Sequence, residues 1–207
     1  LPTETFDDVE GIADLAQKVL DVFYSIPKEE RKGRSVNITV STSSFVPKPF
    51  TPFQFEPQNR MDELIEKQKF LKEKIKSRCI TYNWHQSEVS FLEAVFAKGD
   101  RKLSRVIEKA VALGCRFDGW SDYFSYEKWC EAFKSCGIDP EFYAYRKIGY
   151  DESLPWDIME IGVSKNFIIN EHKKAMAEET TPSCREKCAG CGAASFGGGV
   201  CFEQKKN

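Results

Sequence analysis

Apolar side chains recur every three to four residues in several stretches of the chain, which is the pattern of an amphipathic helix. The first of these helices is predicted to begin near Phe6, where Thr5 can cap the first turn and Asp7 and Asp8 complement its dipole, and to end near Ser25. Further helices are predicted over 61–78, 87–96, 103–113 and 125–137, from Pro140 onward, and over 164–176.

Two short segments alternate between apolar and polar residues and are predicted to be strands. They cover 36–41 and 80–84. Before the second long helix, the segment 45–57 contains four prolines interleaved with four phenylalanines. Because proline removes a backbone donor, this segment is predicted to be an extended aromatic loop. We expect its rings to pack against the helix that begins near Met61, with part of the loop facing a cavity.

The order of these elements predicts an α/β fold. A helix–strand–helix–strand opening is followed by an all-helical stretch and a cysteine-rich end. Two strands do not complete a parallel sheet, whose crossover units need partners on both sides. We therefore expect the missing strands to lie before Leu1, and the chain, which does not begin with methionine, to be a piece of a longer polypeptide.

Composition narrows the class of protein further. The 207 residues are 41% hydrophobic and 30% charged, as in a globular protein with a sizeable core. The net charge of −2 gives no general reason to expect binding to nucleic acid or to a membrane. No apolar run reaches the roughly 20 residues of a membrane-spanning helix, and the first residues do not resemble a secretory signal. The sequence predicts a cytoplasmic protein.

Four of the eight cysteines are crowded near the end of the chain. Cys184, Cys188 and Cys191 form a C-x3-C-x2-C pattern with glycines beside it, and Cys201 follows after a glycine run. In a reducing compartment this spacing favours one metal site, either zinc or an iron–sulfur cluster, since both accept thiolates. The alternative is a flexible tail with four unused thiols.

The same C-x3-C-x2-C pattern holds the catalytic [4Fe-4S] cluster of radical S-adenosylmethionine enzymes. In that family the motif follows the first barrel strand and leaves one iron open for S-adenosylmethionine. Here it follows all recognisable elements, and Cys201 can supply a fourth ligand that closes the site. The resemblance to the family is carried by other segments.

Leu1-Pro2-Thr3-Glu4-Thr5 resembles the Gly-Leu-Pro-Gly-Glu-Thr segment that follows the fifth barrel strand in many radical S-adenosylmethionine enzymes, with Thr3 in place of the second glycine. The stretch 40–57 resembles the sixth strand and following loop of an uncharacterised iron–sulfur oxidoreductase-like subfamily, whose full-length members place a cobalamin-binding-like region before the barrel. Further similar segments are Asn83-Trp84-His85, 88–101, 117–120, Leu154-Pro155-Trp156-Asp157 and the closing cysteines.

This resemblance covers nearly the whole chain and implies its organisation. Residues 1–84 would be the C-terminal part of a partial TIM-like barrel, 85–178 a mainly α-helical extension, and 179–207 a metal-binding tail. The upstream half of the same polypeptide would hold the [4Fe-4S] cluster and S-adenosylmethionine, with cobalamin as an open further cofactor. The family's chemistry is reductive cleavage of S-adenosylmethionine to a 5'-deoxyadenosyl radical, which abstracts hydrogen from a substrate. This chain alone is expected to be inactive.

Candidate site residues follow from that placement. Ser41, Thr42, Ser43 and Lys48 leave the C-terminal end of a barrel strand, where barrel enzymes place their active sites. Histidine is the residue type whose reference pKa lies near neutrality, so His85 is a candidate general acid or base. A capping or loop role is the alternative for His85.

A second class of function stays open: a non-catalytic, zinc-stapled helical module that binds RNA or a protein partner. An acidic and aromatic loop that can face a substrate contains Asp118, Trp120, Asp122 and Tyr123, and loop packing and helix capping are the alternative roles for it. Basic residues that can face RNA occur within 67–78 and at Lys98, Arg101, Lys102 and Arg105. Acidic residues are mixed among them, so a solvated helix surface is the alternative.

Overall fold

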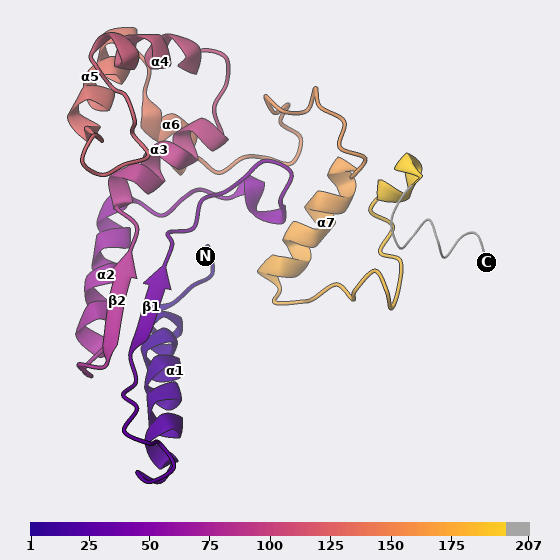
Figure 1. Ribbon diagram of the computed structural model, residues 1–207. Coiled ribbons are helices and arrows are strands. Elements are labelled where there is room, and N and C mark those ends of the chain that lie inside the picture. Colours follow the sequence, from indigo (N-terminus) through magenta and orange to yellow (C-terminus); the bar gives the residue numbers. More distant parts are fainter. Residues whose placement is uncertain (198–207) are drawn as a thin grey trace.

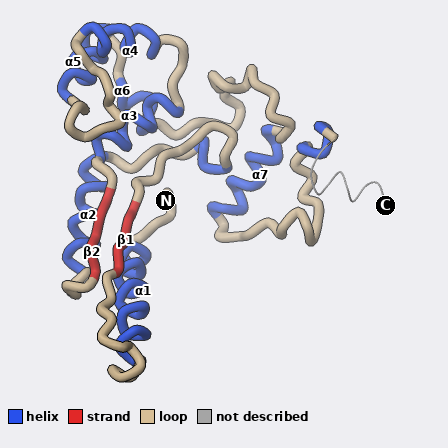
Figure 2. Tube along the Cα trace, in the orientation of Figure 1, coloured by secondary structure: helices blue, strands red, loops and turns tan. Residues whose placement is uncertain are grey.

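The computed structural model describes residues 1–197. An α/β part comes first and a helical part follows (Figures 1 and 2). The elements in chain order are α1 (Phe6–Ser25), β1 (Ile38–Thr42), the 3-10 turn η1 (Pro52–Phe55), α2 (Met61–Lys74), β2 (Ile80–Trp84), α3 (Ser87–Ala97), α4 (Leu103–Ala112), α5 (Tyr126–Cys136), α6 (Pro140–Tyr145), α7 (Lys165–Met176) and the 3-10 turn η2 (Ala193–Phe196).

The sheet consists of β1 and β2, which run parallel. Ile38 lies opposite Ile80, and the register continues to Thr42 opposite Trp84. The connection between them contains α2, as expected for parallel neighbours, which cannot be joined by a tight turn. The predicted α/β class is therefore confirmed. Within residues 1–197 the sheet stops at two strands and does not form a barrel.

The two faces of the sheet differ in polarity. On one face, apolar residues of both strands pack under α1 and α2, in two clusters that include Ala16, Leu20 and Leu71. The opposite face presents exposed polar side chains from both strands, namely Thr39, Ser41, Thr81 and Asn83. Both helices thus cover the same side of the sheet, and the other side is polar.

The helix boundaries follow local capping chemistry. The Thr5 hydroxyl accepts a hydrogen bond from Asp8 N–H, and the Asp8 carboxylate accepts one from Thr5 N–H at 2.8 Å, which fixes the start of α1 as predicted. Helix α2 ends at Lys74, before the predicted end near Arg78, because Ile75 adopts extended backbone and packs into both clusters beneath the helices. Every helix within residues 1–197 is too short or too polar to traverse a lipid bilayer.

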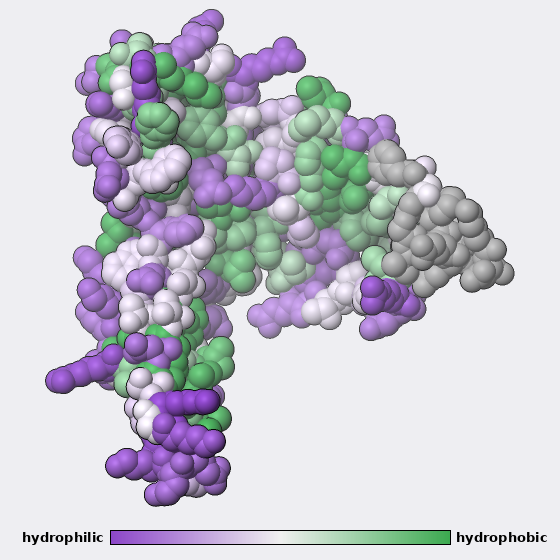
Figure 3. All heavy atoms as spheres, viewed as in Figure 1, coloured by the Kyte–Doolittle hydropathy of each residue, from purple (hydrophilic) through white to green (hydrophobic). Residues whose placement is uncertain are grey.

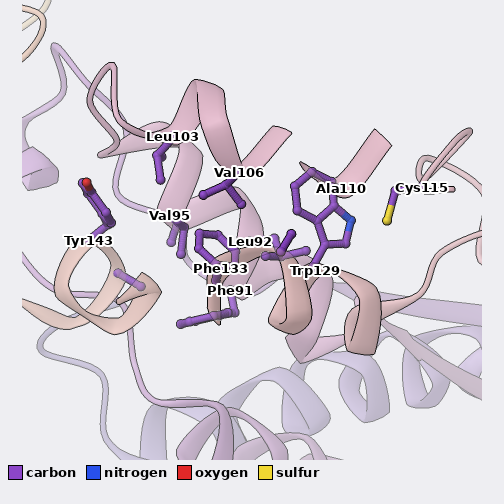
Figure 4. Packing of buried hydrophobic residues seen from close by; sticks show 13 residues of the cluster. Phe91, Leu92, Val95, Leu103, Val106, Ala110, Cys115, Trp129, Phe133 and Tyr143 are labelled. Atoms are coloured by element: carbon purple, nitrogen blue, oxygen red, sulfur yellow. The ribbon is translucent and has the colours of Figure 1, made fainter. Parts of the chain in front are cut away.

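Helices α3 to α6 form a separate lobe around one apolar core (Figure 4). Val95, Val106 and Phe133 are almost fully buried at its centre. Gly99 makes the tight connection between α3 and α4 possible, because a Cβ at this position would lie 2.9 Å from the Val95 carbonyl oxygen and 2.2 Å from Leu103. The lobe is therefore held by close packing between consecutive helices.

The part of the proline-rich loop that contains η1 packs against a different helix from the one predicted. Phe55 is fully buried with Trp156 and Ile168, so η1 contacts α7 and the segment before it. Gln54 fixes this arrangement, since its Oε1 accepts hydrogen bonds from Trp156 Nε1 at 2.9 Å and from Phe50 N–H at 2.8 Å. The expectation that the rings lie on α2 was wrong for Phe53 and Phe55, because α7 supplies the surface that they cover. Phe45 lines a pocket together with residues of α2, so this part of the loop faces a cavity as predicted.

Candidate functional site

A small pocket lies at the carboxyl ends of the two strands, on the side covered by helices. It has a volume of about 110 Å³ and is lined by Thr42, Ser43 and Tyr82 together with residues of α1 and α2. The Thr42 and Tyr82 hydroxyls are hydrogen-bonded at 2.9 Å. Burial raises the pKa of Tyr82 above its ordinary value, although the hydrogen bond with Thr42 opposes the shift. Tyr82 is therefore a neutral hydroxyl at physiological pH.

The other residues predicted for this site lie elsewhere around the strand ends. Ser41 is exposed on the opposite, polar face of the sheet. Lys48 forms an exposed ion pair with Glu93 on α3. His85 is exposed and follows β2, where its backbone N–H donates to the Thr42 carbonyl at 3.4 Å. The structure thus brings Thr42 and Ser43 into one pocket and directs Ser41, Lys48 and His85 to other surfaces.

The cysteine tail contacts the start of α7 through its backbone. The Cys191 carbonyl accepts a hydrogen bond from Ser164 N–H at 3.0 Å, and Ser164 also caps α7 through its hydroxyl. Gly192 has a φ of 103°, and a Cβ there would lie 2.7 Å from the Gly162 carbonyl oxygen. This close approach requires glycine, so Gly192 allows the tail to lie against the start of α7. The tail also forms the short turn η2, whereas no regular element was predicted there.

The three thiols of the tail that the structure describes do not form a set of metal ligands. Cys184 and Cys188 are exposed, and Cys191 is half-buried. The Cys191 sulfur accepts a hydrogen bond from Ala193 N–H at 3.4 Å. Within the described part of the chain, no three His, Cys, Asp or Glu side chains gather closely enough to hold a metal ion. The predicted fourth ligand, Cys201, lies outside the described residues.

Buried ionisable groups that were not predicted include Lys98 and His172. Lys98 is buried, and its ammonium group donates to the carbonyls of Glu56 at 3.0 Å and Arg146 at 2.9 Å. Burial lowers the pKa of Lys98 to about 8, and the nearby Arg146 charge adds to the effect. Lys98 therefore does not belong to a basic surface for RNA, which corrects the expectation from the sequence. His172 on α7 is also buried, between Glu56 and Tyr150.

The acidic and aromatic loop and the basic residues of α2 differ in how they are exposed. Phe117, Trp120 and Tyr123 are each about two-thirds exposed. The ring centroid of Phe117 lies 6.3 Å from that of Trp120 and 6.0 Å from that of Tyr123. Acidic residues neutralise part of the positive charge of α2. Lys67 pairs with Glu4, just before α1, and Lys74 pairs with Glu10 on α1. The acidic and aromatic loop is thus exposed, as a contact surface requires, whereas α2 offers a mixed surface.

Comparison with known proteins assigns no family. No family model and no solved structure matches the chain. Over 108 residues, which are 52% of its length, the chain is 27% identical to an uncharacterised protein, MJ0966, of Methanocaldococcus jannaschii. The matched part is 21% of that relative, so the chain spans about a fifth of the length of the curated protein that it matches.

Proposed function

We propose that this chain is the C-terminal part of a radical S-adenosylmethionine enzyme. The observation that carries the proposal is the two-faced sheet. Both strands are parallel and adjacent, both helices cover one face, and the other face is polar. A sheet covered by helices on both sides would be apolar on both faces, whereas the wall of a (β/α) barrel has helices outside and its own side chains inside. A polar inner face suits a barrel whose interior binds a cofactor and a substrate.

The uncovered surface of α1 supports the same arrangement. Ile12, Leu15, Val19 and Val22 repeat at intervals of three and four residues and are 37% to 66% exposed. They form an apolar stripe, called here the α1 stripe, beside the face of the helix that packs on the sheet. Within the described residues, only part of the apolar surface of α1 is therefore buried. In a barrel, a preceding βα unit would pair with the free edge of the sheet and cover this stripe. We propose that the upstream half of the same polypeptide supplies that unit.

In this scheme the upstream half holds the [4Fe-4S] cluster and S-adenosylmethionine, and the present chain completes the wall. When bound, the cluster and S-adenosylmethionine supply a carbon radical that abstracts hydrogen from a substrate. Ser41 and Asn83 project from neighbouring strands on the polar face and are placed to donate and accept hydrogen bonds with polar groups of the ligands. The exclusion of water falls to the loops beyond Thr42, which lead into η1.

The cysteine tail would hold a second metal centre, either an iron–sulfur cluster or zinc. The Ala193 N–H donating to the Cys191 sulfur and the glycine contacts that fix this part of the tail support this role. Cobalamin in the upstream half remains an open part of the proposal. The rival class, a zinc-stapled module that contacts RNA or a protein, draws support from the exposed aromatic group around Trp120.

Anaerobic purification of the chain, with measurement of its visible absorbance and of bound iron and zinc, distinguishes these classes. Absorbance of an iron–sulfur cluster in the tail is the expected result for the radical enzyme. One zinc per chain without a visible chromophore fits both classes, and RNA binding then separates them. For the second case, binding of single-stranded RNA to the chain and to Trp120→Ala would then be compared.

A further inference from the structure

Glu56, His172 and Tyr150 form a hydrogen-bonded chain that leads from the interior to the surface. His172 Nε2 lies 3.1 Å from Glu56 Oε1, and His172 Nδ1 lies 2.6 Å from the Tyr150 hydroxyl oxygen. Glu56 and His172 are buried, whereas Tyr150 is 36% exposed. Neither the radical enzyme nor the binding module uses these residues, so a role for them is independent of both proposed functions.

The direction of the hydrogen bonds follows from the donors available. An ionised carboxylate only accepts, so Glu56 requires the proton of a neutral imidazole to lie on Nε2. Nδ1 of His172 is then an acceptor, and the Tyr150 O–H donates to it. This is the order of groups, carboxylate, imidazole and hydroxyl, that activates a hydroxyl nucleophile in enzymes.

The packing around His172 keeps the imidazole in this orientation. Phe53 and Phe55 lie edge to face against its ring, with centroids 6.0 and 5.5 Å away. Phe55 also packs edge to face on Tyr150 at 4.9 Å. Both aromatic neighbours belong to η1, and the buried Gln54 fixes η1 to the segment before α7. The imidazole is therefore held between η1 and its own helix.

Tyr150 borders a hollow of about 250 Å³ that is otherwise lined by Phe55, Lys147, Ile148 and Gly149. The Lys147 ammonium lies 2.7 Å from Glu56 Oε1. A second ammonium, on Lys173, lies 5.5 Å from the centre of the Tyr150 ring. The Lys147 charge is already paired with Glu56, so the apolar floor beside the Lys173 ammonium is what favours a small anionic molecule with an aromatic or aliphatic part.

We propose that Tyr150 is a reactive hydroxyl, activated by His172, which Glu56 positions, in a site for small anionic organic molecules. In its simplest reaction the phenol oxygen attacks an acyl carbon and forms an ester. The bond between the acyl carbon and its leaving group breaks, the phenolic proton passes to His172 Nδ1, and that proton then passes to the leaving group. Glu56 stabilises the imidazolium that exists between the two proton transfers.

N-acetylimidazole tests this activation, because it acetylates tyrosine hydroxyls and the acetyl group is located by peptide mass spectrometry. Tyr123 is the internal control, since it is 64% exposed against 36% for Tyr150. Exposure alone predicts faster acetylation of Tyr123. We expect Tyr150 to react about tenfold faster or more, since a positioned general base contributes roughly 10²–10⁴-fold in enzymes.

Two variants separate activation from packing. His172→Gln keeps a donor for Glu56 but removes the base at Nδ1, so the rate at Tyr150 should fall to that of an ordinary exposed tyrosine. Glu56→Gln keeps an acceptor for His172 and should lower the rate at Tyr150 less. The rate at Tyr123 should stay constant in both. If His172→Gln does not fold, the comparison of Tyr150 with Tyr123 in the unaltered chain decides the matter.

The ligand class is tested by protection with benzoate, a small aromatic anion. Benzoate should slow acetylation of Tyr150 and leave Tyr123 unaffected, and Lys173→Gln should abolish the protection. Tyr150 reacting no faster than Tyr123, or reacting equally fast in His172→Gln, would overturn the proposed activation. Absence of protection by benzoate would overturn the proposed ligand class.

Discussion

The hydroxyl groups of Thr42 and Tyr82 lie 2.9 Å apart and join the carboxyl ends of the two parallel strands from the side of the helices. Tyr82 pairs in register with Val40, so this contact runs diagonally to the end of β1. It adds a side-chain link to the backbone hydrogen bonds of a sheet that has only two strands among residues 1–197.

Tyr82→Phe should therefore lower the free energy of unfolding by about 1 kcal/mol, the typical net value of one hydrogen bond. A double-mutant cycle with Thr42→Val, measured by urea unfolding, should give a coupling of similar size. Tyr123→Phe is the matched control, because its ring is exposed, and it should change stability by less than about 0.5 kcal/mol. Additive effects of Tyr82→Phe and Thr42→Val would show that the two hydroxyls do not interact.

Gly99→Ala should destabilise the helical lobe by about 1–3 kcal/mol, the usual cost of overpacking. The added methyl group would overlap Leu103 and approach the Val95 carbonyl oxygen to 2.9 Å. Gly119→Ala is the control, since no atom lies within 4 Å of a Cβ at that position. Thermal unfolding of the two variants should differ clearly, and equal transition temperatures would contradict the packing described for Gly99.

The buried Lys98 makes stability depend on pH in the alkaline range. Its pKa is about 8 in the folded chain and about 10.4 when unfolded, so between these values the unfolded chain binds more protons. The contribution of Lys98 to the free energy of unfolding should therefore rise as the pH increases from about 8 to about 10. Unfolding of the wild type and of Lys98→Met, measured across this range, should show the wild type gaining relative to the variant. A constant difference would mean that the Lys98 pKa is not lowered.

Cys188→Ser should lower the metal content of the chain, because three or four thiolates are expected to bind one metal centre. Cys130→Ser is the control, since Cys130 is exposed on α5, far along the sequence from the tail. Metal analysis of both variants after identical anaerobic purification makes the comparison. Unchanged metal content in Cys188→Ser would exclude Cys188 as a ligand.

Local signals in the sequence predicted most of the elements. Thr5 and Asp8, Ser125 with Gly137, and Ser164 mark helix ends through contacts within one or two turns, and the structure confirms α1, α5 and α7 close to their predicted bounds. Alternating residues likewise predicted β2 correctly. Such signals depend on neighbours in sequence, so they can be recognised without knowledge of the fold.

Contacts between distant residues could not be predicted in the same way. The prolines of the loop before α2 predicted an extended segment, in which the structure has the 3-10 turn η1, and they did not indicate that Phe55 packs near Ile168. His172 lies among the polar residues of α7, and only the fold places it against Glu56, 116 positions earlier. Lys98 occurs in a charged stretch that is typical of a surface, yet carbonyls from two distant segments surround its ammonium group. The buried polar groups were missed because nothing local distinguishes them.

The space-filling view shows apolar patches among polar surface, and the α1 stripe is the one that the proposed barrel would cover (Figure 3). If an upstream βα unit packs there, Leu15→Asp and Val22→Asp should reduce association of the present chain with a separately expressed upstream half. Lys18→Asp, on the polar part of the same helix, should have little effect. Pull-down of the two halves measures this, and equal binding of all three variants would contradict the proposed packing of α1.

Formation of 5'-deoxyadenosine from S-adenosylmethionine under anaerobic reducing conditions tests the proposed enzyme class most directly. The polypeptide that includes the sequence before Leu1 and the 207-residue chain alone would be reconstituted with iron and sulfide and assayed side by side. We predict cleavage by the longer polypeptide and none by the chain alone, because one wall of a barrel cannot enclose the cofactor. Cleavage by the chain alone at a comparable rate would mean that Cys184, Cys188 and Cys191 hold the catalytic cluster, and absence of cleavage by both would contradict the assignment to radical S-adenosylmethionine enzymes.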